Sequence, residues 1–139
     1  MSTNLKILLQ TIADLHSTDA KTKVGCGVIT SGEFIWGVNN IVKDIPQEDI
    51  DNRTTIYYDA IEHSEIHMFN KASQMGVSLK GTTVYVTLFP CDNCAKRLIE
   101  EGVIKVIAYE DRPNADYIIR AKELFIKNNI EFEIIEGGD

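Results

Sequence analysis

The sequence has little cysteine, no long apolar run and no excess of basic residues. Three cysteines in 139 residues are too few for the disulfide framework of a small secreted domain, so a reducing, cytoplasmic location is expected. No apolar stretch reaches the roughly 20 residues of a membrane span, and no membrane partner is expected. The formal net charge of −7 disfavours a nucleic-acid partner, because proteins that follow a phosphate backbone carry a basic patch. These absences favour a small-molecule substrate.

The composition is that of an ordinary globular chain. With 44% hydrophobic and 25% charged residues, a chain of 139 residues is long enough to bury a sizeable core. No linker or repeat interrupts it, so residues 1–139 are predicted to form one domain. The apolar residues near the N-terminus recur at helical spacing between polar ones, which indicates a core-packing helix and not a signal peptide.

Hydrophobic periodicity and turn residues predict four helices and five strands. The expected helices cover residues 4–16, 62–75, 91–102 and 114–125, with Thr3 or Asn4 capping the first and Asn114 or Asp116 capping the last. The expected strands cover residues 24–30, 33–39, 82–88, 103–109 and 130–134. Residues 40–58 show no period and are predicted to form a lid or binding loop.

The order of these elements predicts the fold class. Strands 82–88 and 103–109 are apolar on both faces, as parallel strands covered by helices are. Residues 130–134 alternate apolar with acidic side chains, as an edge strand does. Ser31-Gly32 is predicted to join the first two strands as a hairpin turn. Strands that alternate with helices require crossover connections. The predicted fold is therefore α/β: a three-layer α/β/α sandwich with a five-stranded mixed sheet.

Two short segments carry the chemistry: residues 63–65 (His-Ser-Glu) and residues 90–94 (Pro-Cys-Asp-Asn-Cys). Cys91 and Cys94 are three residues apart at a predicted helix start, which places both sulfur atoms on one face near the positive end of the helix dipole. With the neutral imidazole of His63 they supply three nitrogen and sulfur ligands of the kind that Zn²⁺ prefers. Three protein ligands leave a fourth position open, which is typical of a catalytic zinc site.

Glu65 is the candidate proton carrier. It lies two residues from His63, a poor spacing for a second ligand on one regular helix. Its carboxylate is instead predicted to take a proton from zinc-activated water and to pass it to a ring nitrogen and then to the leaving amine. A His-x-Glu segment followed by Pro-Cys-x-x-Cys is the signature of the zinc deaminases.

The resemblance extends beyond this signature. Residues 87–96 (TLFPCDNCAK) and 102–107 (GVIKVI) resemble the cytidine and deoxycytidylate deaminase family, and its deoxycytidylate deaminases in particular. Residues 23–29 (KVGCGVI) are similar to the first strand of that family. The likeness covers about residues 21–109. It implies a cytidine deaminase-like fold, bound zinc, and the hydrolytic deamination of dCMP to dUMP and ammonia.

The resemblance also implies contacts to the substrate. Asn39 stands where the family has the asparagine of a Gly-Tyr-Asn-Gly turn, which gives it the sugar hydroxyl. The backbone near Ser64 is implied to meet the pyrimidine edge. Lys21 and Lys23, in the loop before the first strand, are implied to meet the phosphate. Since many relatives are hexamers, a homo-oligomer, either a hexamer or a dimer, is expected.

Arg53 is a further candidate contact for the phosphate. A phosphate dianion requires a nearby cation, and the chain as a whole is strongly acidic. Arg53 lies in the segment predicted to be a lid or binding loop.

Other interpretations remain open at this stage. His67 lies four residues from His63 on the same predicted helix face, so both histidines with Cys91 and Cys94 would complete a structural Cys₂His₂ site. Otherwise His67 is predicted to lie in or beside the pocket. A Cys-x-x-Cys pair is also found in redox dithiols. The remaining alternatives are deamination of another pyrimidine or of a tRNA adenosine, and a structural-zinc module that binds nucleotides without converting them.

Overall fold

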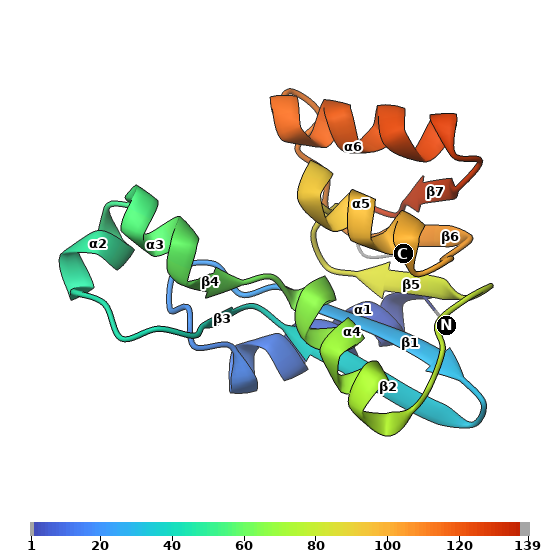
Figure 1. Cartoon of the computed structure of the whole chain (residues 1–139), viewed down its shortest axis with the longest axis horizontal. Coiled ribbons are helices and arrows are strands. Elements are labelled where there is room, and N and C mark those ends of the chain that lie inside the picture. The colour runs from blue at the N-terminus through green and yellow to red at the C-terminus, as the bar shows by residue number, and fades with distance from the viewer. Residues whose placement is uncertain (1, 137–139) are drawn as a thin grey trace.

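The computed structural model describes residues 2–136, and its centre is a mixed five-stranded sheet (Figure 1). β1 is antiparallel to both of its neighbours, β2 and β5, whereas β5, β6 and β7 run parallel to one another. The strand order is β2-β1-β5-β6-β7, so β7 is the edge strand that its alternating pattern predicted. The strands are β1 Gly25–Thr30, β2 Glu33–Val38, β5 Thr83–Val86, β6 Lys105–Ala108 and β7 Glu131–Ile134.

Helices cover both faces of this sheet. On one face α1 (Ser2–His16) packs against β1 and β2. On the other face α4 (Ser64–Met75), α5 (Asp92–Glu100) and α6 (Asp116–Lys127) share one apolar core with the strands. The predicted three-layer α/β/α sandwich is therefore confirmed. Within residues 2–136 no helix is both long enough and apolar enough to cross a bilayer.

The hairpin of β1 and β2 shows which residues point to which face of the sheet. Ser31 and Gly32, the predicted turn, both have positive φ angles of 51° and 76°, as a two-residue type I′ hairpin turn requires. Cys26 pairs with Gly37 across the two strands, so both residues face the same side of the sheet, that of α4. Gly25, one residue earlier, faces the backbone of Leu9 in α1. Successive residues of one strand thus contact helices on opposite faces.

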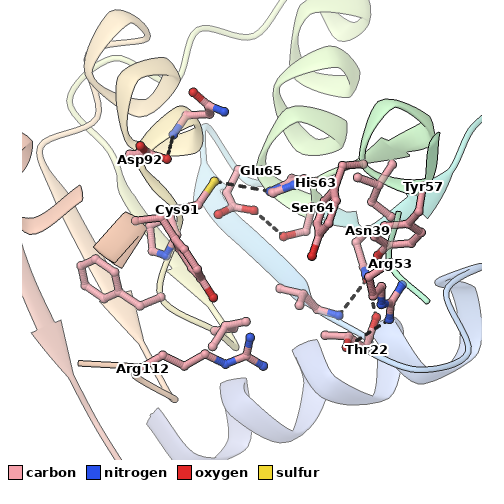
Figure 2. A pocket seen from close by; sticks show the side chains of 18 residues that line it. Thr22, Asn39, Arg53, Tyr57, His63, Ser64, Glu65, Cys91, Asp92 and Arg112 are labelled. Atoms are coloured by element: carbon pink, nitrogen blue, oxygen red, sulfur yellow. Dashed lines mark hydrogen bonds between the residues drawn. The ribbon is translucent and has the colours of Figure 1, made fainter. Parts of the chain in front are cut away.

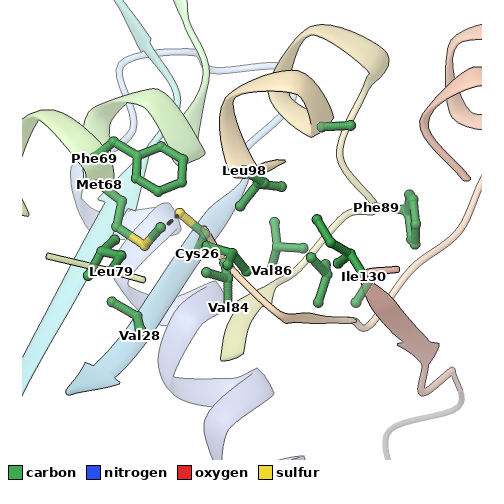
Figure 3. Close-up of a cluster of buried hydrophobic side chains, with 14 of the residues drawn as sticks. Cys26, Val28, Met68, Phe69, Leu79, Val84, Val86, Phe89, Leu98 and Ile130 are labelled. Atoms are coloured by element: carbon green, nitrogen blue, oxygen red, sulfur yellow. Dashed lines mark hydrogen bonds between the residues drawn. The ribbon is translucent and has the colours of Figure 1, made fainter. Parts of the chain in front are cut away.

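The core lies between the sheet and helices α4–α6 (Figure 3). Val84 and Val86 of β5 are fully buried beside Val106 and Ala108 of β6. Alternate residues of these parallel strands thus line one core, because side chains two apart share a face. Burial of apolar surface in this core is the main favourable contribution to the free energy of folding, at about 25 cal/mol per Å².

Residues 40–62 form an arm that extends from the body of the molecule (Figure 1). The arm includes residues 40–58, which were predicted to lack secondary structure, and this prediction was wrong. It holds two short helices, α2 (Gln47–Asp51) and α3 (Thr55–Ala60), between paired strands β3 (Asn40–Ile41) and β4 (Ile61–Glu62). Elements of two to six residues are too short to show a hydrophobic period.

Two predicted helix starts were also wrong. The first helix already includes Ser2, so Thr3 and Asn4 lie inside it and not at its N-cap position. The last helix has Ala115 as its N-cap, without a side-chain hydrogen bond, and not Asn114 or Asp116. A capping side chain contributes only about 1 kcal/mol, so packing of the helix against the core overrides that preference.

Candidate active site

The candidate site forms where the N-termini of α4 and α5 meet. His63 is the N-cap of α4 and Cys91 is the N-cap of α5, and both have extended backbone angles. The carbonyl oxygen of each accepts the first hydrogen bond of its helix, from the amide N–H groups of His67 and Ala95. As N-caps, the two residues lie at the partly positive helix ends, where their side chains are free to point away from the helix axis.

Gly37 allows α4 to approach the sheet closely enough for this meeting. A Cβ atom at position 37 would collide with the backbone carbonyl oxygen of Ser64 and with the backbone nitrogen of Met68. Both atoms belong to the first turns of α4 and cannot move without shifting the helix. The absence of a side chain on β2 thus determines where the ligand-bearing end of α4 lies.

His63, Cys91 and Cys94 are close enough to share one metal ion. The Nδ1 atom of His63 lies 3.6 Å from the Cys91 Sγ and 3.3 Å from the Cys94 Sγ, and the three ligand atoms lie within 4.8 Å of one another. In a tetrahedral zinc site with ordinary bond lengths, nitrogen and sulfur ligands are separated by about 3.6 Å. The three donors therefore fit Zn²⁺.

The same three side chains are electrostatically coupled. The pKa of Cys91 is lowered to about 4, first because Cys94 donates a hydrogen bond to its sulfur and then because His63 does. The pKa of His63 is raised to about 9, chiefly by its hydrogen bond to Cys91. The pKa of Cys94 is raised because its proton is shared with the Cys91 thiolate. A bound cation replaces these protons, so metal binding and deprotonation of the ligands are linked.

Glu65 lies in the first turn of α4, beside the ligands (Figure 2). It is buried, and its Oε1 accepts a hydrogen bond of 2.7 Å from the Ser64 hydroxyl. Burial raises the pKa of this carboxyl, while the nearby charge of His63 acts in the opposite direction. A buried carboxyl of raised pKa is suited to accept a proton and to release it again.

The ligands and Glu65 open into a cavity of about 470 Å³. This volume is in the range of small-molecule sites in proteins. The wall combines the two helix starts with residues of the 22–24 segment, of the arm and of the segment that follows β6. Figure 2 shows these side chains around one opening.

His67 is not among the residues that line the cavity, so of the two predicted placements, in the pocket or beside it, the first does not hold. Its Nδ1 accepts a hydrogen bond of 3.0 Å from the backbone N–H of Val38, on the outer strand β2. Burial and the Lys71 ammonium lower the pKa of His67, which keeps the imidazole neutral and able to accept. Within residues 2–136, the one group of histidine, cysteine and acidic side chains with metal-ligand geometry is the trio without His67. This geometry argues against a Cys₂His₂ site.

Replacing His67 by alanine is expected to leave the zinc content unchanged while lowering the free energy of unfolding by about 1–3 kcal/mol, since the Val38 N–H loses its acceptor. Metal analysis and urea denaturation measure the two quantities. His67→Gln, which keeps a hydrogen-bond acceptor, is the control and should lose less stability. Loss of zinc from His67→Ala would restore the Cys₂His₂ alternative.

The structure brings Asn39 and Ser64 to the cavity wall. The Asn39 Oδ1 accepts from the Ser17 hydroxyl and from the Val24 N–H, each at 2.8 Å. Its Nδ2 donates to the Thr22 carbonyl oxygen at 2.7 Å, so one amide hydrogen is left for a ligand. Asn39 therefore also joins the loop before β1 to the end of β2.

Lys21 and Lys23 are not part of the cavity wall. The Lys21 ammonium donates to the backbone carbonyl oxygen of Asp51, and the Lys23 ammonium donates to that of Ser17. The two lysines therefore extend toward the arm and toward the end of α1. Arg53 does line the cavity, but its guanidinium is held by Asp19.

Several residues of the cavity wall were not predicted from the sequence, among them Arg112, Tyr57, Tyr58 and Tyr117. Arg112 follows β6, the parallel neighbour of the strand that leads to Cys91. The carboxyl ends of adjacent parallel strands meet at one edge of a sheet, and this signal was present in the sequence. No such signal indicated the three tyrosines. Tyr57 and Tyr58 lie on α3, which was not predicted, and Tyr117 was assigned no role.

Three converging zinc donors beside a buried carboxylate, within an α/β sandwich, are the arrangement expected of a catalytic zinc site and not of a structural one. The sequence profile described as "Cytidine and deoxycytidylate deaminase zinc-binding region" matches residues 3–110. The chain belongs to this family.

Two curated relatives extend the match. A probable deoxycytidylate deaminase of Caenorhabditis elegans is 33% identical over 111 residues, which cover 73% of this chain and 53% of that protein. The deoxycytidylate deaminase of Homo sapiens is 29% identical over 127 residues, which cover 84% of this chain and 70% of that protein. The chain thus spans about half the length of the first relative.

A solved structure shows the same fold. The dCMP deaminase of cyanophage S-TIM5, in complex with dCMP and dUMP, aligns with a TM-score of 0.66 and 21% identity. The alignment covers 96% of this chain and 98% of that chain. The cytidine deaminase-like fold implied by the sequence is therefore confirmed.

Proposed function

We propose that residues 1–139 form a zinc-dependent dCMP deaminase, which converts dCMP and water into dUMP and ammonia. The observation that carries this proposal is the buried carboxyl of Glu65 beside three converging zinc donors in one cavity. Support also comes from the relatives, which are named as deoxycytidylate deaminases.

Each residue of the site has a role in this reaction. His63, Cys91 and Cys94 would hold a zinc ion, and the bound ion would supply the Lewis acid that activates water near neutral pH. As the water oxygen bonds to C4 of the cytosine ring, the Glu65 carboxylate takes one proton from the water and delivers it to N3. It then moves the remaining proton of that oxygen to the amino group, which leaves as ammonia when the C4–N bond breaks. The Ser64 hydroxyl, through its hydrogen bond to Oε1, keeps the other carboxylate oxygen available for these transfers.

The substrate contacts follow from the cavity wall. The free amide hydrogen of Asn39 is available to the sugar hydroxyl, and the backbone at Ser64 to the pyrimidine edge. Deamination of a tRNA adenosine is disfavoured by the net charge of −7, because RNA binding depends on neutralising phosphates.

A substrate panel tests the proposal directly. Purified, zinc-loaded protein is incubated with dCMP, dCTP, deoxycytidine, cytidine or cytosine, and ultraviolet absorbance follows the loss of the amino group. We expect dCMP to give the highest kcat/KM. If another compound gives the highest kcat/KM, that compound and not dCMP is the substrate. If none of the compounds is converted, a nucleotide-binding module is the better interpretation.

We also propose an oligomeric state and a cellular location for the enzyme. A homo-oligomer is proposed because large apolar side chains are exposed on α1, among them Ile7 and Leu15. A cytoplasmic location is proposed because all three cysteines are free thiols, and two of them are needed in that form as ligands. Light scattering of the purified protein measures the oligomeric state.

A further inference from the structure

The cavity wall contains two arginines, and one of them is already paired with a carboxylate. The Arg53 guanidinium donates to both carboxylate oxygens of Asp19, at 2.9 and 3.1 Å, and lies over the ring of Tyr57 at 4.1 Å. The Asp19 side chain is fully buried and also accepts a hydrogen bond from the Tyr57 hydroxyl. An arginine in a buried bidentate pair has its charge and its paired donors in use. Arg53 therefore ties the arm to the loop after α1.

Arg112 is in a different situation. It lines the cavity from the segment after β6, and its side chain is 46% exposed. Within residues 2–136 its one ionic neighbour is Glu110, which is itself 60% exposed and lies at 4.0 Å from the Arg112 Nε. An exposed pair at that distance contributes little and leaves the guanidinium donors available.

Apart from the zinc donor His63, the described residues of the wall include no other cationic side chain for an anionic group. Glu65 is a carboxyl, and Asp92 is bound by Arg120 at 2.8 Å. In Figure 2 Arg112 lies on the Cys91 side of the opening, and its guanidinium extends toward the Thr22 side. It is thus placed at the rim of the cavity that Glu65 and the zinc donors line.

We infer that Arg112 binds the 5′-phosphate of the substrate and makes the enzyme selective for a nucleoside monophosphate; this inference rests on the proposed function. A planar guanidinium matches two phosphate oxygens in a bidentate pair, which a lysine ammonium does not reproduce. A phosphate dianion approaching a chain of net charge −7 depends on such a local cation. Lys21 and Lys23, which the family resemblance placed at the phosphate, are outside the wall.

The test compares substrates with and without the phosphate. Arg112→Ala is expected to raise KM for dCMP by about 10- to 100-fold, because the substrate loses one charge-assisted hydrogen-bonding contact. KM for deoxycytidine, which has no phosphate, should change less than about twofold. Arg112→Lys should recover part of the loss. Inorganic phosphate should compete with dCMP in the wild type and much less in Arg112→Ala. Where deoxycytidine turns over too slowly, inhibition by dUMP and by deoxyuridine gives the same comparison.

The controls separate this inference from the proposed function. Lys127→Ala removes one exposed positive charge from the last turn of α6, outside the cavity, and should leave both KM values unchanged. An equal rise in KM for both substrates, or a loss confined to kcat, would overturn the role of Arg112 while dCMP deamination stands. Absence of turnover in the wild type would instead reject the proposed function.

Discussion

Replacing Glu65 by glutamine is expected to lower kcat for dCMP deamination by about 10⁴-fold while zinc remains bound at the wild-type level. Glutamine has nearly the same shape but cannot take a proton from water or return one to the substrate. The metal donors are His63, Cys91 and Cys94, so the substitution removes none of them. The ultraviolet assay gives kcat, and metal analysis of the same sample gives the zinc content.

Glu62→Gln is the matched control for this experiment. Glu62 is three residues earlier, on β4, and it accepts a hydrogen bond from Asn70 outside the cavity wall. Neutralising it should leave kcat within about twofold, because a half-exposed surface charge has a weak effect at a distance. Turnover retained in Glu65→Gln at normal zinc content would reject Glu65 as the proton carrier.

Removing the metal is expected to have an effect of similar size. Cys94→Ser should lose most of the bound zinc and with it more than about 10³-fold of the activity, since a zinc enzyme without its metal lacks both the Lewis acid and the activated water. Wild-type protein treated with a strong chelator should lose activity to the same extent and regain it when zinc is added back. Metal analysis and the same ultraviolet assay measure both effects.

The third cysteine supplies the control for that substitution. Cys26 is fully buried on β1, and its sulfur lies 3.8 Å from the Met68 sulfur, in the core and not at the cavity wall. Cys26→Ala should lower stability by about 1 kcal/mol through the small cavity it leaves, and it should retain zinc. Activity that persists in zinc-free Cys94→Ser would contradict a metal-dependent reaction.

The parts of the site that the sequence predicted are those encoded over a few residues. His63 and Glu65 belong to one tripeptide, and Cys91 and Cys94 belong to one helix start, so spacing alone relates their side chains. The fold class was predictable for a similar reason, because strands such as β5 and β6 show their burial in consecutive residues.

The residues proposed to bind the phosphate were not predictable in this way. Lys21 and Lys23 were implied by the family resemblance because they lie in the loop before the first strand, yet each ammonium donates to a backbone carbonyl away from the cavity. Arg53 reached the wall but is paired with Asp19, which lies 34 residues away in sequence. Whether a charged side chain is free or paired depends on such distant partners, and no local pattern reports them.

By itself the sequence predicted the candidate zinc donors, the candidate proton carrier and the layered α/β architecture, because these predictions draw on local spacing, short motifs and periodicity. Only the tertiary structure decided that Arg53 is held by Asp19, that His67 serves the open edge of β2, and that Arg112 faces the cavity. These assignments depend on contacts between segments far apart in the chain, and such contacts exist only after the sheet and its helices have packed together.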